Sequence, residues 1–271
     1  MERLGVVKIG GSAMSELETI VDEIAGLAAE GWRLVVVHGG GRLVDEYERR
    51  LGMEPRIVVH PSGVRSRYTT REELEVFLMV MAGLIAKRIQ QILADRGVKS
   101  LSLTGLDGLA VEAKRKERII IVNERGRPQV VPGGYTGRIQ RVDKGFVMTL
   151  LRGVPVLVYS PVAYGVDGET GRVTPLNVDG DQMASALAGA LGAPLAFVTD
   201  VPGVILEDGS VAERLTPQEA EDLAKRVGRG MNLKLVMAAR AVRRGAPRAA
   251  IGSPPVVGLL MGERGTVVEG R

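Results

Sequence analysis

Val6-Val7-Lys8-Ile9-Gly10-Gly11-Ser12 opens the chain with an apolar strand pattern that runs straight into two glycines. Val35-Val36-Val37-His38-Gly39-Gly40-Gly41 repeats this arrangement further along. Glycine lets the backbone curl until several amides point at one anion, and a helix that follows adds its positive end. Lys8 adds a full positive charge to the first turn. The two turns therefore predict a cradle for phosphate.

Strand-like and helical stretches alternate around these turns. Apolar residues at helical spacing follow the first turn from Leu17 to Leu27, and the strand pattern of residues 34–37 leads to a helix through Val44 and Leu51. This alternation is typical of a parallel sheet with crossover helices, whose ligands bind at the carboxyl ends of the strands. Both glycine turns would lie at that edge.

The second half of the chain continues the alternation. We expect a helix near residues 143–152, strands at 155–159 and 195–198, and a helix that opens at Asn177 and runs to Leu191. Residues four apart in a helix stack on one face, so Asn177 and Asp181 would share a face of that helix. Two α/β halves in one chain indicate two substrates.

Residues 71–96 form one predicted helix, whose segment 76–86 is apolar on every face. A helix with no polar face must be buried all round. It is therefore either a central core helix or a helix shared with a second subunit, and we favour the second interpretation. The sequence thus predicts a homodimer.

Residues 110–139 differ in character, with short β-like runs and turn signals at 124–128 and 132–134. This pattern is typical of a hairpin region beside the main sheet. The region is strongly basic and carries Lys114, Arg115, Lys116, Arg118, Arg125 and Arg127. Such a run is either a solvated face or a binding surface for an acidic partner.

The composition limits the class of protein and of site. With 271 residues, 45% of them hydrophobic and 25% charged, the chain fits one large ordered domain, with disorder expected only beyond Arg264. The absence of cysteine excludes disulfides, thiolate nucleophiles and cysteine-based zinc sites. His38 and His60 are the only histidines, which argues against a histidine-based metal centre.

No apolar run approaches the roughly 18 residues that cross a bilayer, and no signal-peptide pattern opens the chain. We therefore expect a cytoplasmic protein that binds neither a membrane nor nucleic acid. The net charge of +4 and the pI near 9.5 indicate either an acidic partner or an arginine-rich, heat-adapted composition.

Other familiar sites lack their motifs in this sequence. No Gly-Lys dipeptide is present, which excludes a Walker A loop, and neither glycine turn has the G-x-G-x-x-G spacing of dinucleotide binders. The segment His38-Gly-Gly-Gly41 is similar to an esterase oxyanion loop, but no G-x-S-x-G elbow accompanies it and no histidine follows residue 60. The phosphate site must be of another kind.

A second lysine lies in the first turn of a later predicted helix, in the segment Gly230-Met231-Asn232-Leu233-Lys234. If Lys8 and Lys234 reach one phosphoryl group, they meet from two sides the charge that spreads over its oxygens in a loose transition state. Asp181 between them would fix both ammonium groups. Together these residues predict phosphoryl transfer.

Five motifs follow in the order and spacing of the amino acid kinase family: Lys8-x-Gly10-Gly11, His38-Gly-Gly-Gly41, Asn177-Val-Asp-Gly-Asp181, Thr199-Asp-Val-Pro-Gly203 and Gly230-Met-Asn-x-Lys234. The sequence resembles this family over nearly its whole length, and its N-acetylglutamate kinase branch most. The resemblance implies an α/β fold, an open αβα sandwich with a mainly parallel central sheet, as a single domain over residues 1–271. It also implies an acyl-substrate lobe at about 1–173 and an ATP lobe at about 174–271.

The resemblance also implies roles for individual residues. Lys8 and Lys234 would be catalytic stabilisers of the transition state, with Asp181 organising them. The substrate would be held by Gly40, Gly41, Arg65 and Asn177, with Arg65 gripping its α-carboxylate. Phosphate and ATP would be held by Gly10, Gly11, Asp200, Gly203, Gly228 and Gly230. ATP would arrive with Mg²⁺, held mainly by the nucleotide's own phosphates, without a dedicated metal site or a tightly bound cofactor.

Two segments depart from plain N-acetylglutamate kinases: Pro61-Ser62-Gly63-Val64-Arg65-Ser66-Arg67-Tyr68-Thr69 and Gly133-Gly134-Tyr135-Thr136-Gly137-Arg138-Ile139. Both resemble the branch that phosphorylates aminoadipate or glutamate whose α-amino group is attached to the small acidic carrier protein LysW. The basic hairpin, with Arg67 near the pocket mouth, would then form a collar that holds this carrier.

Two alternatives remain. An N-acetylglutamate kinase would use the same residues on a free acetylated amino acid. A catalytically silent ligand-sensing module would have lost Lys8, Asp181 or Lys234, and all three are present. The similar arginine-inhibited hexamers carry a helix before the first strand that this sequence lacks, so we expect a simple dimer.

Overall fold

A computed structural model describes residues 3–61, 63, 65–168, 170–228 and 230–270. An eight-stranded sheet runs through the molecule in the order β14-β16-β15-β13-β1-β2-β10-β5. Its strands are β14 (Arg214–Leu215), β16 (Thr266–Glu269), β15 (Arg248–Gly252), β13 (Leu195–Val198), β1 (Arg3–Ile9), β2 (Trp32–His38), β10 (Val156–Tyr159) and β5 (Ser100–Leu103). Neighbouring strands are parallel except β15 and β16. The predicted mainly parallel sheet is confirmed, and strands from both halves of the chain share it.

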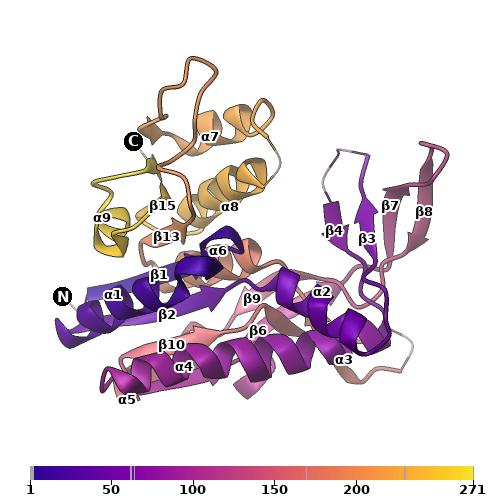
Figure 1. Ribbon diagram of the computed structural model, residues 1–271, viewed down its shortest axis with the longest axis horizontal. Helices are drawn as coiled ribbons and strands as arrows, with labels where there is room; N and C mark the ends of the chain where they lie inside the picture. Colours follow the sequence, from indigo (N-terminus) through magenta and orange to yellow (C-terminus); the bar gives the residue numbers. More distant parts are fainter. Residues whose placement is uncertain (1–2, 62, 64, 169, 229, 271) are drawn as a thin grey trace.

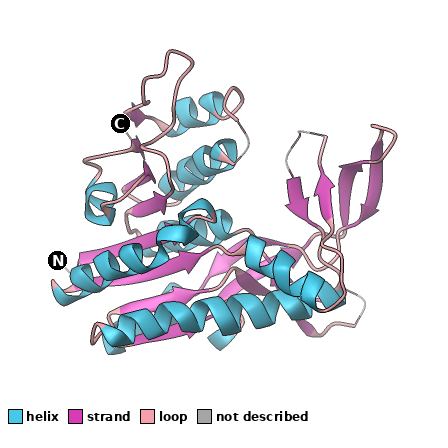
Figure 2. Cartoon of the chain, in the orientation of Figure 1, coloured by secondary structure: helices cyan, strands magenta, loops and turns pink. Residues whose placement is uncertain are grey.

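Helices cover both faces of this sheet (Figures 1 and 2). Val7 and Ile9 of β1 pack into one core with α1 (Leu17–Ala29), α9 (Val256–Met261) and the long helix of residues 71–95, whereas Val6 packs into a second core on the other face. That second core includes α5 (Lys144–Gly153), α6 (Gly180–Leu191) and α8 (Met231–Arg243). Strands buried on both faces are continuously apolar, which explains the runs at 6–9 and 34–37.

The long helix combines α3 (Arg71–Leu78), a π-helical segment (Met79–Ile85, η2) and α4 (Ala86–Asp95). The prediction of one helix over 71–96 is thus confirmed. Within a single chain this helix is not buried all round, and burial of its exposed face by a second subunit stays a prediction. Met79 and Leu84 are 56% and 42% exposed, because only the face with Phe77, Met81 and Ile85 meets the core.

By length and mean hydropathy (1.5) the same helix could cross a bilayer, contrary to the sequence-based expectation. This is weak evidence, because a core helix of a soluble protein passes the same test. Packing against the central sheet supports the interpretation as a core helix.

A second sheet of four strands lies beside the first, in the order β12-β11-β6-β9. It consists of β12 (Val173–Asn177), β11 (Val162–Val166), β6 (Val111–Arg115) and β9 (Gly137–Val142). Two hairpins, β3–β4 (Ile57–Val59 and Arg65–Arg67) and β7–β8 (Arg118–Val122 and Pro128–Pro132), project side by side from one end (Figure 1). The ring of His60 meets the carbonyl of Ile120 at 3.0 Å and links them. The predicted hairpin region is therefore confirmed.

Two other sequence-based expectations are wrong. Asn177 ends β12, and α6 begins only at Gly180, because the Asp179 side chain accepts from the amides of Asp181 and Gln182 and caps the helix. Asn177 and Asp181 therefore share no helix face. Residues 265–270 are ordered, contrary to the expectation for this tail, because β16 pairs with both β14 and β15. The division into an acyl-substrate lobe and an ATP lobe stays a prediction.

The remaining helical segments connect these strands. They are η1 (Ser12–Glu16), α2 (Gly41–Arg50), η3 (Asp107–Leu109) and α7 (Pro217–Leu223). Both η1 and α2 begin directly after a glycine turn, which brings their N-terminal ends to the carboxyl edge of the sheet.

Candidate active site

The two glycine turns are neighbours in space, because β1 and β2 are parallel and Ile9 pairs with His38 at their carboxyl ends. The last residue of β13, Val198, pairs with Ile9 on the other side. Three strands therefore end together around the start of the first turn. This is where an α/β sheet places its ligands.

The glycines at this edge serve different purposes. Gly10 donates its amide to the carbonyl of Val198 at 3.0 Å, so that amide is engaged and not free to hold a phosphate. A Cβ at Gly10 would lie 2.9 Å from the same carbonyl oxygen. Gly11 has open space around it, and Gly40, with φ of 146°, lies so close to Ile85 that a side chain would collide. Gly40 and Gly41 introduce the N-terminus of α2, a local positive end.

Lys8 and Lys234 meet at one carboxylate. The Nζ of Lys8 lies 2.6 Å from Oδ1 of Asp181, and the Nζ of Lys234 lies 3.3 Å from Oδ2. Lys8 and Asp181 are only 6% and 4% exposed. Lys8 comes from β1, Asp181 from the first turn of α6 and Lys234 from the first turn of α8. The structure therefore brings the three predicted catalytic residues together.

The electrostatics keep this group ionised. Burial would lower the pKa of Lys8, but the carboxylates of Asp181 and Asp179 outweigh burial and raise it. Burial would raise the pKa of Asp181, but Lys8 and Lys234 outweigh burial and lower it. The pKa of Asp179 is raised, first by burial and then by the charge of Asp181. The Lys8 ammonium group and the Asp181 carboxylate therefore stay charged at neutral pH.

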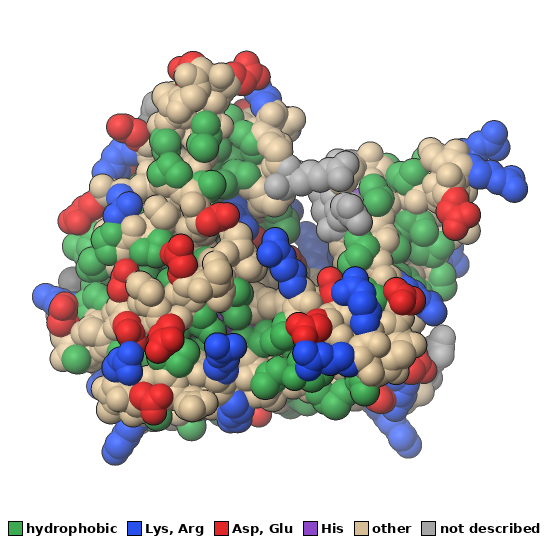
Figure 3. All heavy atoms as spheres, viewed as in Figure 1, with side chains coloured by type: hydrophobic (Ala, Val, Ile, Leu, Met, Phe, Trp, Pro, Cys, Tyr) green, Lys and Arg blue, Asp and Glu red, His purple; other side chains and the backbone are tan. Residues whose placement is uncertain are grey.

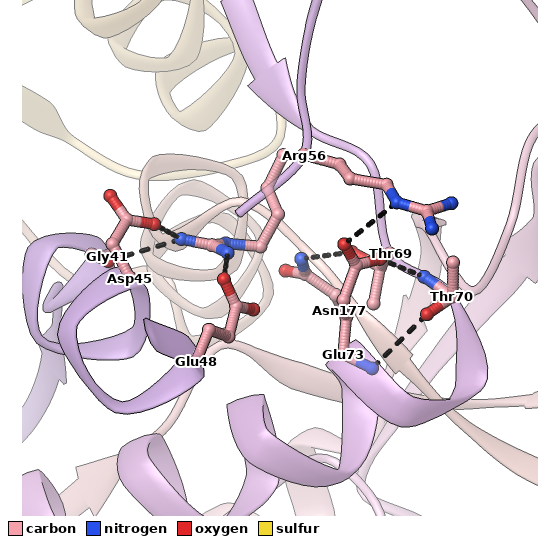
Figure 4. A network of polar contacts seen from close by, with 9 residues as sticks. Gly41, Asp45, Glu48, Arg56, Thr69, Thr70, Glu73 and Asn177 are labelled. Carbon is pink, nitrogen blue, oxygen red and sulfur yellow. Dashed lines mark hydrogen bonds and ion pairs between the residues drawn. The ribbon is translucent and has the colours of Figure 1, made fainter. Parts of the chain in front are cut away.

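A cavity of about 590 Å³ opens beside Lys8. It lies between the β3–β4 hairpin and the face of α8, and Figure 3 shows the surface hollowed between these parts. The glycines at 11, 40 and 41 line it, and so does Asn177. The Nδ2 of Asn177 donates to the hydroxyl of Thr69 at 2.9 Å, which fixes the amide at the cavity wall (Figure 4). A small acyl substrate fits this volume.

Of the residues expected to hold phosphate and ATP, Gly11 lines this cavity, whereas Asp200, Gly203, Gly228 and Gly230 lie outside its lining. Asp200 accepts from the hydroxyl of Thr199 at 3.0 Å, and hydrogen bonds from Ser12 and Thr199 lower its pKa. Gly203 is required by packing, because a Cβ there would meet Val211 and Thr266. Gly228 precedes α8, and Gly230, with φ of 88°, caps it. Their predicted roles in ATP binding stay predictions.

Arg67 and Arg115 do not belong to a free basic collar. The guanidinium of Arg67 contacts the carboxylates of Asp45 and Glu48 and the carbonyl of Gly41, where Figure 4 shows these three groups converging. Arg115 pairs with Asp167 and lies over the ring of Tyr135, 4.4 Å from its centroid. The prediction of a collar is therefore wrong for these two arginines. The side chain of Arg65 lies outside the described residues.

The other basic residues of the hairpin region remain exposed. Arg118, Arg125 and Arg127 lie on β7–β8 and its turn, and no acidic partner is recorded for them among the residues that the structure describes. The amides of Arg125 and Arg127 donate to the side chain of Asn123 at 3.0 Å, which closes the turn. The projecting hairpin thus presents positive charge.

Sequence reasoning missed three features of the site. Thr69 holds Asn177, Ser160 lies under His38, and Arg240 lines the cavity from α8. Only Arg240 had a usable signal, because Leu233, Met237 and Arg240 recur at helical spacing.

Within 3–61, 63, 65–168, 170–228 and 230–270, no group of three or more acidic or histidine side chains has a metal-binding arrangement.

Known proteins resemble this chain in sequence and in fold. The sequence model of the amino acid kinase family matches residues 3–253. A protein of Aeropyrum pernix, provisionally named a LysW-aminoadipate/LysW-glutamate kinase, is 65% identical over 270 residues, 99% of each chain. The LysW-aminoadipate/LysW-glutamate kinase of Saccharolobus islandicus is 44% identical over 250 residues, 92% of this chain and 91% of its own. The structure of Giardia lamblia carbamate kinase bound to AMP-PNP covers 98% of both chains, with a TM-score of 0.70 and 16% identity, and is similar in fold alone.

Proposed function

The chain belongs to the amino acid kinase family, and we propose that it transfers the γ-phosphoryl group of ATP to the side-chain carboxylate of LysW-linked aminoadipate or glutamate. The products are ADP and an acyl phosphate. Identity of 65% over nearly the full length to one relative of that name supports this choice of substrate. The observation that supports phosphoryl transfer itself is the contact of Lys8 and Lys234 with Asp181 at the edge of the cavity.

The mechanism needs only positioning and charge. The acceptor carboxylate attacks the γ-phosphorus in line, the bond to the β,γ-bridging oxygen breaks, and ADP leaves with that electron pair. Lys8 and Lys234 approach the transferring group from two elements and stabilise its equatorial oxygens. Asp181 holds both ammonium groups in place, so little reorganisation is needed during transfer.

Backbone groups complete the site. The amides of Gly11, Gly40 and Gly41, with the N-terminus of α2, would hold the phosphoryl group and the acceptor. Asn177 and Arg65 would hold the substrate. Mg²⁺ would bind through the nucleotide's phosphates and supply further charge neutralisation, since the described residues include no metal-binding cluster.

The projecting β7–β8 hairpin would recruit the acidic carrier. Arg118, Arg125 and Arg127 are exposed on it, and surface charge of this kind steers an oppositely charged partner over distances of about 8 Å at physiological salt. The carrier's modified terminus would then reach the cavity beside β3–β4. We further propose a cytoplasmic homodimer, with the exposed Met79 and Leu84 in its interface.

The deciding experiment is a coupled ATPase assay on three acceptors: carrier-linked aminoadipate, carrier-linked glutamate and free N-acetylglutamate. We expect turnover of one or both carrier-linked acceptors and little of the free one. Preference for free N-acetylglutamate would instead establish an acetylglutamate kinase. Turnover of none of the three would establish a silent module.

The hairpin is tested by charge reversal. Arg125→Glu should lower kcat/KM for the carrier-linked acceptor at low salt and leave the KM for ATP unchanged. Lys144→Glu, an exposed cation at the start of α5, is the matched control. Equal effects of the two variants would exclude a role of the hairpin in carrier binding.

A further inference from the structure

Apart from Lys8 and Arg67, three cationic side chains line the cavity. Lys116 follows β6, Arg138 lies in β9 and Arg240 lies in α8. The amide of Lys116 donates to the carbonyl of Thr136 at 2.8 Å, so the β6–β9 ladder continues to this point and brings Lys116 near Arg138. Arg240 faces the cavity together with Leu233 and Met237, which precede it by two turns and one turn on α8.

The cluster of Lys116, Arg138 and Arg240 has no counter-charge in contact. Among the side chains that the structure describes, none of the three forms an ion pair with an acidic residue. Arg67 and Arg115, by contrast, are held by carboxylates. The cluster is therefore the part of the basic wall whose charge is still available to a ligand.

Arg138 repels both of the other cations. The pKa of Lys116 is lowered, mainly by burial, and Arg138 lowers it further, although Asp179 acts in the opposite direction. The pKa of Arg240 is lowered, mainly by burial, then by Arg138 and Arg244, although Glu221 acts in the opposite direction. Like charges directed at one space cost free energy that a bound anion would recover.

The cluster is separate from the catalytic group. Lys234 turns toward Asp181, whereas Arg240 on the same helix faces the cavity. Lys8, with the glycine turns, marks where the transferring phosphoryl group would lie. An anion between Lys116, Arg138 and Arg240 would be a second anionic group of the molecule that occupies the cavity.

We propose that Lys116, Arg138 and Arg240 form a second anion subsite, which binds a carboxylate of the acceptor other than the one that is phosphorylated. Planar guanidinium groups suit a carboxylate, which they can bind through two parallel hydrogen bonds. This proposal rests on the proposed function in one respect: the acceptor must carry more than one carboxylate. That second carboxylate belongs either to the amino acid itself, in which case the cluster would share it with Arg65, or to the carrier segment attached to it.

The test uses Arg138→Gln, Arg240→Gln and the double variant, with Arg244→Gln as control, since Arg244 is exposed at the end of α8 and does not line the cavity. The double variant should raise the KM for carrier-linked aminoadipate by about 10-fold or more, because charge-assisted hydrogen bonds to a carboxylate are lost. Its kcat and its KM for ATP should stay within about twofold, since Lys8, Asp181 and Lys234 are intact.

The acceptors distinguish the two sources of the carboxylate. A raised KM for both N-acetylglutamate and the carrier-linked acceptor would show that the subsite binds the amino acid's own carboxylate. A raised KM for the carrier-linked acceptor alone would show that it binds a carboxylate of the carrier. A raised KM for ATP with unchanged acceptor KM overturns the proposal, and so does a double variant that matches Arg244→Gln.

Direct binding separates the subsite from the proposed function. Calorimetric titration of wild type and double variant with N-acetylglutamate in the presence of ADP needs no turnover. Suppose that the wild type does not phosphorylate carrier-linked acceptors, but binds N-acetylglutamate and the double variant does not. The proposed function then fails and the subsite stands. If both proteins bind it equally and carrier-linked KM is unchanged, the subsite fails.

Discussion

The Nε2 atom of His38 lies 3.0 Å from the hydroxyl oxygen of Ser160, and both side chains are completely buried. The same hydroxyl donates to the carbonyl of Met81 at 3.2 Å, inside the π-helical segment. Ser160 therefore joins the glycine turn that follows His38 to the long helix.

Ser160→Ala should lower the free energy of unfolding by about 1–3 kcal/mol, because it leaves the buried Nε2 atom of His38 without its partner. Ser185→Ala is the matched control, since that buried hydroxyl donates only to the carbonyl of Met237, at 2.7 Å. Urea denaturation should give the larger loss for Ser160→Ala. Equal losses would show that the contact with His38 contributes nothing.

His38 makes stability depend on pH. Burial, and then the charge of Lys8, lower the pKa of His38 to about 4. Between pH 6.5 and about pH 4, His38 is protonated in the unfolded chain and neutral in the folded protein. The free energy of unfolding therefore decreases as the pH falls through this range. From pH 7 to pH 5 the loss should be about 2 kcal/mol.

The measurement is the difference in unfolding free energy between wild type and His38→Asn at both pH values. This difference should shrink at pH 5, because only the wild type carries the buried imidazole. A difference that is constant from pH 7 to pH 5 would contradict the lowered pKa.

Lys8→Ala and Lys234→Ala should each lower kcat by about 10²–10³-fold, as the loss of one preorganised charge does. Steady-state kinetics with the carrier-linked acceptor checks this. Lys225→Ala is the control, because Lys225 forms an exposed pair with Asp222. A variant at Lys8 or Lys234 that stays within a few-fold of wild type would remove that lysine from the mechanism.

Arg67→Ala should destabilise the protein by about 3–5 kcal/mol, because it leaves the buried carboxylate of Glu48 without its partner. Arg50→Ala, which breaks the exposed pair with Glu46, should cost less than about 1 kcal/mol. Thermal or urea unfolding distinguishes the two. The double change Arg67→Met with Glu48→Leu should recover part of the loss, and no recovery would mean that Arg67 acts through other contacts.

Met79→Glu and Leu84→Glu should convert a homodimer into a folded monomer, because each places a charge on the exposed face of the long helix. Met81→Glu should instead unfold the chain, since Met81 is in the core. Sedimentation velocity with circular dichroism separates these outcomes. A wild-type monomer at micromolar concentration would exclude the dimer.

Sequence patterns predicted the parts of the fold that depend on apolar periodicity. The buried runs of β1 and β2, the helix over 71–95 and the helix with Lys234 are all where they were expected. Asn177 was assigned to the wrong element, because β12 contributes a proline and a polar end rather than an alternating pattern, and the cap at Asp179 moves the helix start.

The contacts that could not be predicted from the sequence are those between residues far apart along the chain. Nothing local shows that Arg67 is held by α2, or that Arg115 is held by Asp167, because both partners are distant in sequence. The same holds for Ser160 beneath His38. Charge composition therefore overestimated the free basic surface. Arg240 recurs at helical spacing with Leu233 and Met237, but nothing local shows that Lys116 and Arg138 of the four-stranded sheet share its cavity wall.

The strand β1 lies between β2 and β13, so its pairing in the sheet can be completed only after β13 has been synthesised. A nascent polypeptide that ends before residue 195 contains both glycine turns, yet one edge of β1 is unpaired and open to aggregation. Lys234 is translated later still. Unfinished chains therefore lack one of the two lysines proposed to stabilise the transition state.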